Sequence, residues 1–166
     1  MSKETKVTAA FVRELFHYDP ETGVFTRLVT RQGLGARAGD IAGTRKPSGY
    51  LSIWICGANH MAHRLAWLYV HGKWPAHEID HIDGNRANNA IANLRDVTRS
   101  VNHENLRSAR SDSAHGFLGV SPFFGKWKAR ITVNGKFQHL GTFSTPEEAH
   151  AAYLEAKRRL HVGCTI

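Results

Sequence analysis

The chain has 166 residues, 42% of them hydrophobic, so it is long enough to bury one modest core or several small ones. Its 22 Lys and Arg residues outnumber 14 Asp and Glu, and the net charge of +8 indicates an anionic partner. No apolar run approaches the ~20 residues of a membrane span, so we expect a cytoplasmic protein that does not enter membranes. Two distant cysteines, Cys56 and Cys164, argue against both a disulfide framework and a thiolate zinc site.

The first 60 residues predict a small basic, β-rich region. Residues 7–17 have helical spacing after Thr8, a good N-cap, and residues 24–29 and 50–56 are typical of strands. The stretch between these strands is rich in glycine and arginine. Its glycines are either loop punctuation or places where the backbone approaches a DNA phosphate chain.

Residues 62–71 predict a helix that ends at Gly72 and supports the segment that follows. Arg64 lies near the start of this helix. It could meet a substrate phosphate, although an arginine at a helix end is more often simply solvated.

The most polar stretch of the chain begins at residue 79 with Ile-Asp-His-Ile-Asp-Gly and continues through several asparagines to Asn102. Carboxylate, imidazole and amide groups are poor material for a hydrophobic core and good material for a metal site. Asp80 and His81 are adjacent on an extended segment, so their side chains point to opposite sides of the backbone. Thr98 predicts the cap of a helix over residues 99–108.

The spacing of Asp80-His81, Asn93 and Asn102 resembles that of HNH endonucleases of the ββα-metal type, in the variant whose last H is an Asn. The flanking segments 62–67, 72–75 and 93–95 are similar to those of phage-encoded homing or nicking members. The resemblance implies that His81 is the general base, that Asp80 and Asn102 are metal ligands, and that Asn93 braces the loop. It also implies a bacterial host cytoplasm as the place of action.

The chemistry agrees with this resemblance. A neutral imidazole can take a proton from water, and one carboxylate with one amide oxygen suits a single Mg²⁺ or Mn²⁺ ion. This assignment requires that the three groups converge and that the imidazole is open to solvent. His103 competes with Asn102, because the two lie about 100° apart on the helix and only one can face the site. The spacing favours Asn102.

The last fifty residues predict a second module after a linker at 111–115. Three antiparallel strands are expected at 117–121, 126–133 and 136–143, the last two joined by Asn134-Gly135, followed by a helix capped by Thr145. A two-residue turn pairs Ala129 with Leu140 on an apolar face. The opposite face is basic and is expected to bind DNA through Lys126, Lys128, Arg130, Thr132, Phe137 and His139. A merely solvated face is the alternative.

Residues 116–163 resemble the plant ethylene-response-factor DNA-binding domain, on the strength of Gly119-Val120, Gly125-Lys126-Trp127, Leu140–Phe143 and Glu147–Tyr153. In place of the arginines that follow Gly-Val in the plant domains, this chain has residues 121–124, Ser-Pro-Phe-Phe. The site preference of the plant domains is therefore not carried over.

Together these patterns predict an α+β protein with an N-terminal region at 1–60, an HNH core at 61–110, the linker, and a DNA-binding domain at 116–166. The expected function is metal-dependent hydrolysis of double-stranded DNA, with no protein partner. The alternatives are a DNA-binding regulator with an inactive nuclease core and a nuclease that acts on RNA.

Overall fold

The computed structural model describes residues 7–30, 36–109 and 115–166, which include His115 but none of the other predicted linker residues. The chain divides into two compact units, Met1–Val97 and Thr98–Ile166. The division falls inside the predicted nuclease core, so the domain boundaries expected from the sequence stay predictions. Within the described ranges, no helix combines the length and apolarity needed to cross a bilayer.

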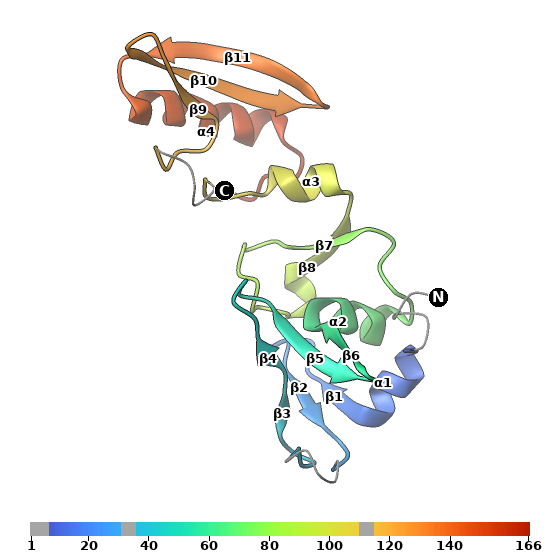
Figure 1. The fold of residues 1–166 in the computed structure, drawn as a ribbon. Coiled ribbons are helices and arrows are strands. Elements are labelled where there is room, and N and C mark those ends of the chain that lie inside the picture. The colour runs from blue at the N-terminus through green and yellow to red at the C-terminus, as the bar shows by residue number, and fades with distance from the viewer. Residues whose placement is uncertain (1–6, 31–35, 110–114) are drawn as a thin grey trace. The chain divides into compact units, whose positions relative to one another are not determined.

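The first unit contains two helices and several short antiparallel strand sets (Figure 1). In chain order these are α1 (Ala9–Leu15), β1 (Phe16–Tyr18), β2 (Phe25–Arg27), β3 (Ile41–Ala42), β4 (Thr44–Arg45), β5 (Leu51–Ile55), β6 (Ala58–Met61), α2 (Ala62–His71), β7 (Glu78–His81), the 3₁₀ turn Ile91–Asn93 and β8 (Leu94–Val97). The predicted caps are confirmed: Thr8 accepts a hydrogen bond from Phe11 N, and α2 ends at Gly72 with φ of 74°.

A single hydrophobic cluster holds this unit together and positions the polar stretch. Its buried members include Val12 and Phe25 from the N-terminal region, Leu65 from α2, and Ile79 and Leu94 from β7 and β8. Burial of such side chains contributes about 1.5–3 kcal/mol each. The predicted N-terminal region and the strands of the predicted nuclease core therefore share one core.

The second unit contains α3 (Arg99–Glu104), the sheet β9 (Val120–Phe123), β10 (Lys126–Val133) and β11 (Lys136–Phe143), and helix α4 (Pro146–Leu160). The strand order is β11-β10-β9, and α4 lies against the sheet (Figure 1). Tyr153 and Ala156 of α4 pack with Ile131 of β10. Thr145 and Glu148 form the predicted capping box. The predicted α+β class, with a three-stranded sheet on one helix, is confirmed.

The predicted register of the β10–β11 hairpin is right near the turn and wrong beyond it. Val133 pairs with Lys136 and Arg130 with His139, as expected, but a bulge at Ala129/Arg130 then pairs Ala129 with Gly141 rather than with Leu140. The extra residue is Leu140, which stays packed against the apolar cluster under the sheet. Gly141 has φ of 146°, a conformation that glycine adopts without strain, which permits the bulge.

Candidate active site and nucleic-acid interface

Strands β7 and β8 place Asp80, the predicted metal ligand, and His81, the predicted base, at the edge of the first unit's core. They are antiparallel, with Asp80 opposite Arg95 and His81 opposite Leu94. Asp80 and His81 are both buried, with exposed fractions of 6% and 4%. Adjacent side chains on a strand point to opposite faces, so the carboxylate and the imidazole meet different surroundings.

The imidazole of His81 is held by a buried amide. Its Nε2 lies 3.1 Å from Oδ1 of Asn89, a side chain that is 1% exposed. A carbonyl oxygen only accepts, so in this arrangement Nε2 carries the proton and the lone pair is on Nδ1. Burial lowers the pKa of the His81 imidazole, against smaller opposing effects of Asn89 and nearby carboxylates, and therefore favours the neutral ring.

Asn89 is itself fixed by the N-terminal region. Its carbonyl oxygen accepts a hydrogen bond of 2.7 Å from the buried Tyr18 hydroxyl. Gly23 packs so closely on its backbone that an added Cβ would lie 2.3 Å from the Asn89 carbonyl carbon. The partner of His81 is therefore positioned by residues more than sixty positions away in sequence.

Two aromatic rings pack against His81. The His63 ring meets it edge to face with centroids 5.1 Å apart, and the Tyr50 ring lies 5.8 Å away. Burial, followed by the charges of His81 and Arg64, lowers the pKa of His63 to about 3, so His63 is neutral at pH 7. The expectation of an imidazole open to solvent is wrong: these rings and Asn89 leave only 4% of the residue exposed.

Asp80 forms an ion pair with its cross-strand neighbour. Its Oδ2 accepts from Arg95 Nε at 2.8 Å and from Nη2 at 2.7 Å, and the Asp80 side chain is 7% exposed. The pair places a guanidinium directly beside a buried carboxylate, which compensates its charge.

Asn93 joins the two ends of the polar loop. Its Oδ1 accepts from Asp83 N at 2.9 Å, and its Nδ2 donates to Asp83 Oδ1 and to Asn88 O, both at 2.9 Å. Its carbonyl oxygen accepts from Ile82 N directly after β7. These bonds brace the loop between the two strands.

Arg64 braces another segment near the strands. Its Nη1 donates to His77 O at 3.1 Å, and its guanidinium lies 5.9 Å from the centre of the Trp74 ring. Both contacts hold the segment that leads into β7. That Arg64 meets a substrate phosphate during catalysis stays a prediction.

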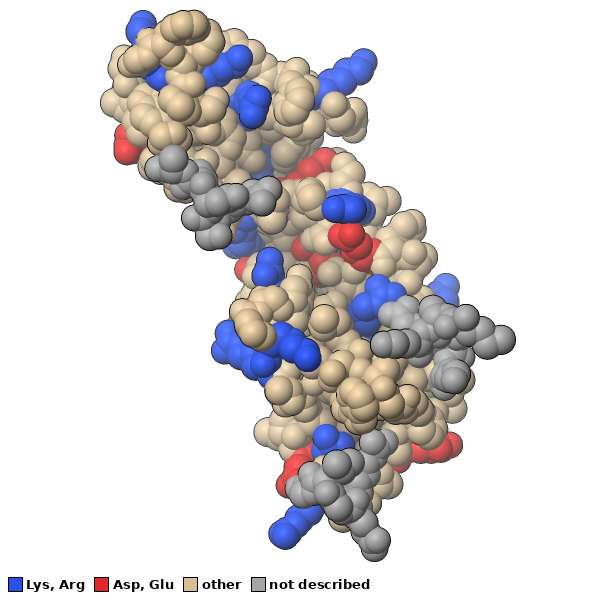
Figure 2. Space-filling model, viewed as in Figure 1, with Lys and Arg blue, Asp and Glu red and all other residues tan. Residues whose placement is uncertain are grey.

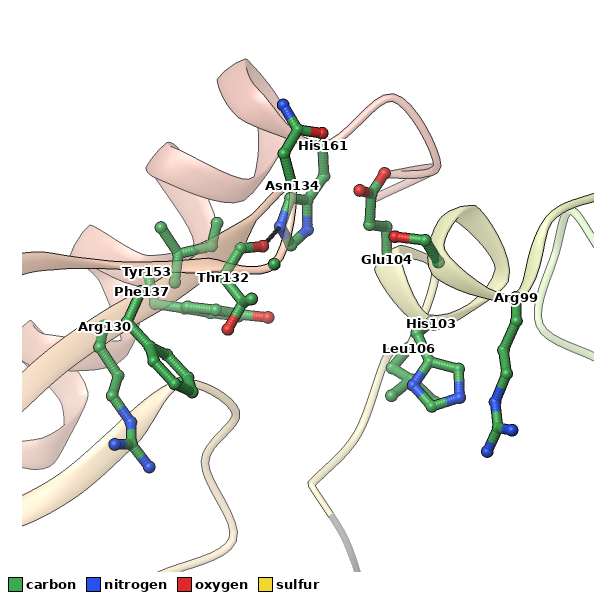
Figure 3. Close-up of a pocket in the computed structure, with 14 residues that line it drawn as sticks. Arg99, His103, Glu104, Leu106, Arg130, Thr132, Asn134, Phe137, Tyr153 and His161 are labelled. Carbon is green, nitrogen blue, oxygen red and sulfur yellow. Dashed lines mark hydrogen bonds between the residues drawn. The ribbon is translucent and has the colours of Figure 1, made fainter.

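Asn102 lies on α3, which begins after the N-cap Thr98 and ends at Glu104, earlier than the predicted residue 108. It belongs to the second unit, whereas Asp80 and His81 belong to the first. Its assignment as a metal ligand stays a prediction. The neighbouring His103 lines a cavity of about 650 Å³ in the second unit, and Asn102 is not among the residues lining it (Figure 3).

The predicted DNA-binding residues lie on one face of the second unit's sheet. Arg130, Thr132, Phe137 and His139 occupy paired positions of β10 and β11, and all four are exposed. Lys128 follows on the same face, half-buried, and Lys126 is exposed at the start of β10. Where the sheet appears in Figure 2, Lys and Arg lie mainly among uncharged residues.

Part of this face opens into the cavity that His103 lines. Arg130 and Phe137 contribute from the sheet, and Arg99 contributes from α3 (Figure 3). The Arg130 guanidinium lies 5.3 Å from the centre of the Phe137 ring. The cavity thus combines cationic and aromatic side chains, which can bind a phosphate and a base.

Comparison with known proteins identifies the polar stretch. Residues 60–107 match the HNH endonuclease family, a range that contains Asp80, His81, Asn93 and Asn102. Protein 3.8 of Escherichia phage T7 is 32% identical over 102 residues, which cover 60% of this chain and 83% of the phage protein. The chain carries an HNH endonuclease domain and belongs to one family with that phage protein. No solved structure matches the chain.

The HNH domain contains three side-chain contacts that the motif alone does not reveal. Asn89 resembles ordinary loop material, His63 resembles a residue of an amphipathic helix, and Arg95 resembles a solvated strand residue. In the structure Asn89 and His63 contact His81, and Arg95 pairs with Asp80. The one available sequence signal was proximity: Asn89 and Arg95 lie within fifteen positions of Asp80.

Proposed function

We propose that the chain is a divalent-metal-dependent DNA endonuclease in which His81 is the general base, acting in a phage or mobile-element setting. The observation that carries this proposal is the neutral His81 of the HNH domain, with Nε2 tied to a fixed amide. General-base catalysis requires a neutral imidazole whose acceptor nitrogen is defined.

The chain's own residues supply the proton transfer and its geometry. His81 accepts a proton from water at Nδ1, while Asn89 holds the ring by Nε2. Asn93 keeps the loop between β7 and β8 closed, so the strand end that carries His81 keeps its shape. Because His81 is 4% exposed, this role requires that Tyr50 or His63, the rings packed against it, moves to admit water and a phosphate.

The donor set fits a hard divalent cation in chemical type. Asp80 supplies a carboxylate, an oxygen ligand of the kind that a hard divalent cation prefers. A bound Mg²⁺ or Mn²⁺ ion would neutralise charge on the phosphate and stabilise the leaving oxygen. Asp80 is the residue of the first unit that we assign to hold it, one ion per site. Groups of three or more His, Cys, Asp or Glu able to hold a metal are absent from the described ranges.

Incubation with supercoiled plasmid tests this proposal. With Mg²⁺ we expect conversion to nicked or linear DNA, and with EDTA we expect the conversion to stop, because the phosphate charge is no longer neutralised. Parallel incubation with a structured RNA distinguishes the two substrates. Cleavage that persists in EDTA would contradict the metal role, and cleavage of RNA alone would contradict the DNA assignment.

A DNA-binding regulator with an inactive core is the second candidate. It is favoured by the burial of His81 and by the engagement of the Asp80 carboxylate with Arg95. Both candidates bind DNA, and only turnover separates them. Failure of every divalent cation to support cleavage, with DNA binding intact, would select the regulator.

Asn89→Ala tests the tie to the imidazole. Mutation of a residue that orients a functional group through a hydrogen bond typically lowers activity by about 10–100-fold. We expect a loss of that size in plasmid cleavage. Asn88→Ala is a suitable control, because the Asn88 amide bonds Asp83 rather than His81. Equal losses in the two variants would mean that Asn89 only maintains the loop.

We further infer that the basic face of the second unit's sheet binds double-stranded DNA. Two observations support this inference. The side chains of Lys126, Arg130, Thr132 and His139 are exposed, and residues 116–163 resemble the ethylene-response-factor domain. Lysine and arginine contact phosphates, while strands presented to a groove can read base edges.

The double variant Lys128→Gln/Arg130→Gln tests this face. Removal of two phosphate contacts should reduce the slope of log K against log salt by roughly 1.8, because each contact on a duplex contributes about 0.9. Titration of a labelled duplex at several salt concentrations measures the slope. The control Arg158→Gln/Arg159→Gln changes the net charge equally on exposed residues of α4. An equal change in both double variants would mean that net charge, and not this face, sets the affinity.

A further inference from the structure

The hairpin between β9 and β10 has an unusual residue at its tip. Phe123 pairs with Lys126, so the loop consists of Phe124 and Gly125, with φ of 45° and 75°. Positive φ at both central residues defines a type I′ turn, which prefers Asn-Gly. The turn at the other end of β10 has Asn134 and Gly135, with φ of 50° and 75° (Figure 1). A bulky side chain in this conformation is strained.

Packing within the protein does not compensate for the strain. Phe124 is 94% exposed, and Phe123, whose ring meets it edge to face at 4.8 Å, is 42% exposed. Neither ring belongs to the hydrophobic cluster between the sheet and α4. A strained, exposed aromatic residue at a hairpin tip is best explained by a role in binding.

The surroundings of the tip are cationic. Lys126 follows the turn directly, and Lys128 Nζ lies 5.3 Å from the centre of the Phe123 ring. The sequence has no Asp or Glu from residue 116 to residue 146. The matching partner presents negative charge on its outside and flat apolar surfaces within reach, which describes DNA.

We propose that Phe124, backed by Phe123, is a wedge that inserts between base pairs of the DNA bound by the sheet. This inference rests on the proposed DNA binding by the basic face. A ring at a two-residue turn extends beyond the last strand pair, Phe123 with Lys126, so it can enter the base stack while Lys126 and Lys128 remain at the phosphates. Apolar wedges of this kind open a base step and kink the duplex.

The variant Phe124→Asn separates this role from folding. It creates the same Asn-Gly turn as residues 134–135, so its Tm should equal or exceed that of the wild type. Binding is measured with the full chain in EDTA, by anisotropy of two labelled short duplexes that differ only in a mismatched central step. The wild type should bind the mismatched duplex on the order of tenfold more tightly, because this step is already partly unstacked. Phe124→Asn should bind both duplexes equally.

The control Arg130→Gln should lower affinity for both duplexes by one common factor, since it removes a phosphate contact. A wild type without the preference, or a Phe124→Asn variant that retains it, overturns the wedge and leaves sheet binding intact. Absence of binding to either duplex overturns both. Binding to vesicles of equimolar phosphatidylcholine and phosphatidylserine is measured as well. If Phe124→Asn loses vesicle binding but keeps the wild-type preference between the duplexes, the ring belongs to a membrane surface and the wedge is overturned. Nuclease activity does not enter these readouts.

Discussion

His81→Ala should lower cleavage of supercoiled plasmid by about 10²–10⁴-fold, the usual contribution of a positioned general base. The physical reason is the local setting of His81. The Asn89 amide holds its Nε2 at 3.1 Å, and burial lowers the pKa of the imidazole, so the ring is neutral and can accept a proton. Quantitative gel analysis of single-turnover reactions measures the loss. Binding of a labelled duplex in EDTA should remain unchanged, which separates lost chemistry from lost affinity.

A matched control for His81→Ala is His77→Ala. His77 precedes β7, its side chain is 55% exposed, and its ring nitrogen lies 3.5 Å from the Asp96 carboxylate. We expect His77→Ala to retain cleavage within a factor of about two, as is usual for exposed positions. Undiminished cleavage by His81→Ala would remove the imidazole from the chemistry and make His63, the ring packed against it, the next base to test.

The sequence predicted the elements that have strong local signals. Helix α4 has its capping box within four residues, and the Asn134-Gly135 turn fixes the first pairs of the β10–β11 hairpin. The bulge at Ala129/Arg130 was not predictable, because alternation along a strand says nothing about an extra residue. Its position follows from packing of Leu140 under the sheet, a tertiary requirement.

The short strands of the first unit were missed for a related reason. Strands β3 and β4 have two residues each, and β6 follows the turn at Cys56 and Gly57, where φ is 49° and 76°. Segments of this length have no measurable period, and their pairing depends on neighbours far along the chain. The Gly-rich stretch that contains β3 and β4 was interpreted as a loop or as backbone approaching a DNA phosphate chain, and residues 31–35 of it lie outside the described ranges.

In the candidate active site, too, the sequence predicted the local features and missed those that depend on tertiary contacts. Spacing was sufficient to select Asp80, His81 and Asn93, because a motif fixes residue types along the chain. The groups that act on them come from tertiary contacts: Asn89 is set by Tyr18 and Gly23, and His63 reaches His81 from α2. Solvent access was predicted wrongly, because sequence spacing does not show which rings will cover the imidazole.

Arg95→Gln should destabilise the first unit by roughly 2–4 kcal/mol, because it leaves the Asp80 carboxylate buried without its ion-pair partner. The two side chains lie opposite each other on β7 and β8, and the carboxylate is 7% exposed. Urea unfolding followed by tryptophan fluorescence measures the loss. Three of the four tryptophans, Trp54, Trp67 and Trp74, lie in this unit.

The double variant Asp80→Asn/Arg95→Gln removes both charges and should lose less stability than Arg95→Gln alone, since no uncompensated charge remains. Repeating the unfolding with Mg²⁺ tests the proposed ligand. If Asp80 holds the cation, Mg²⁺ should raise the free energy of unfolding of Arg95→Gln, in which the Asp80 carboxylate has lost Arg95, and leave the double variant unchanged. An equal response in the two variants would place the cation elsewhere, because Asp80 is the one carboxylate by which they differ.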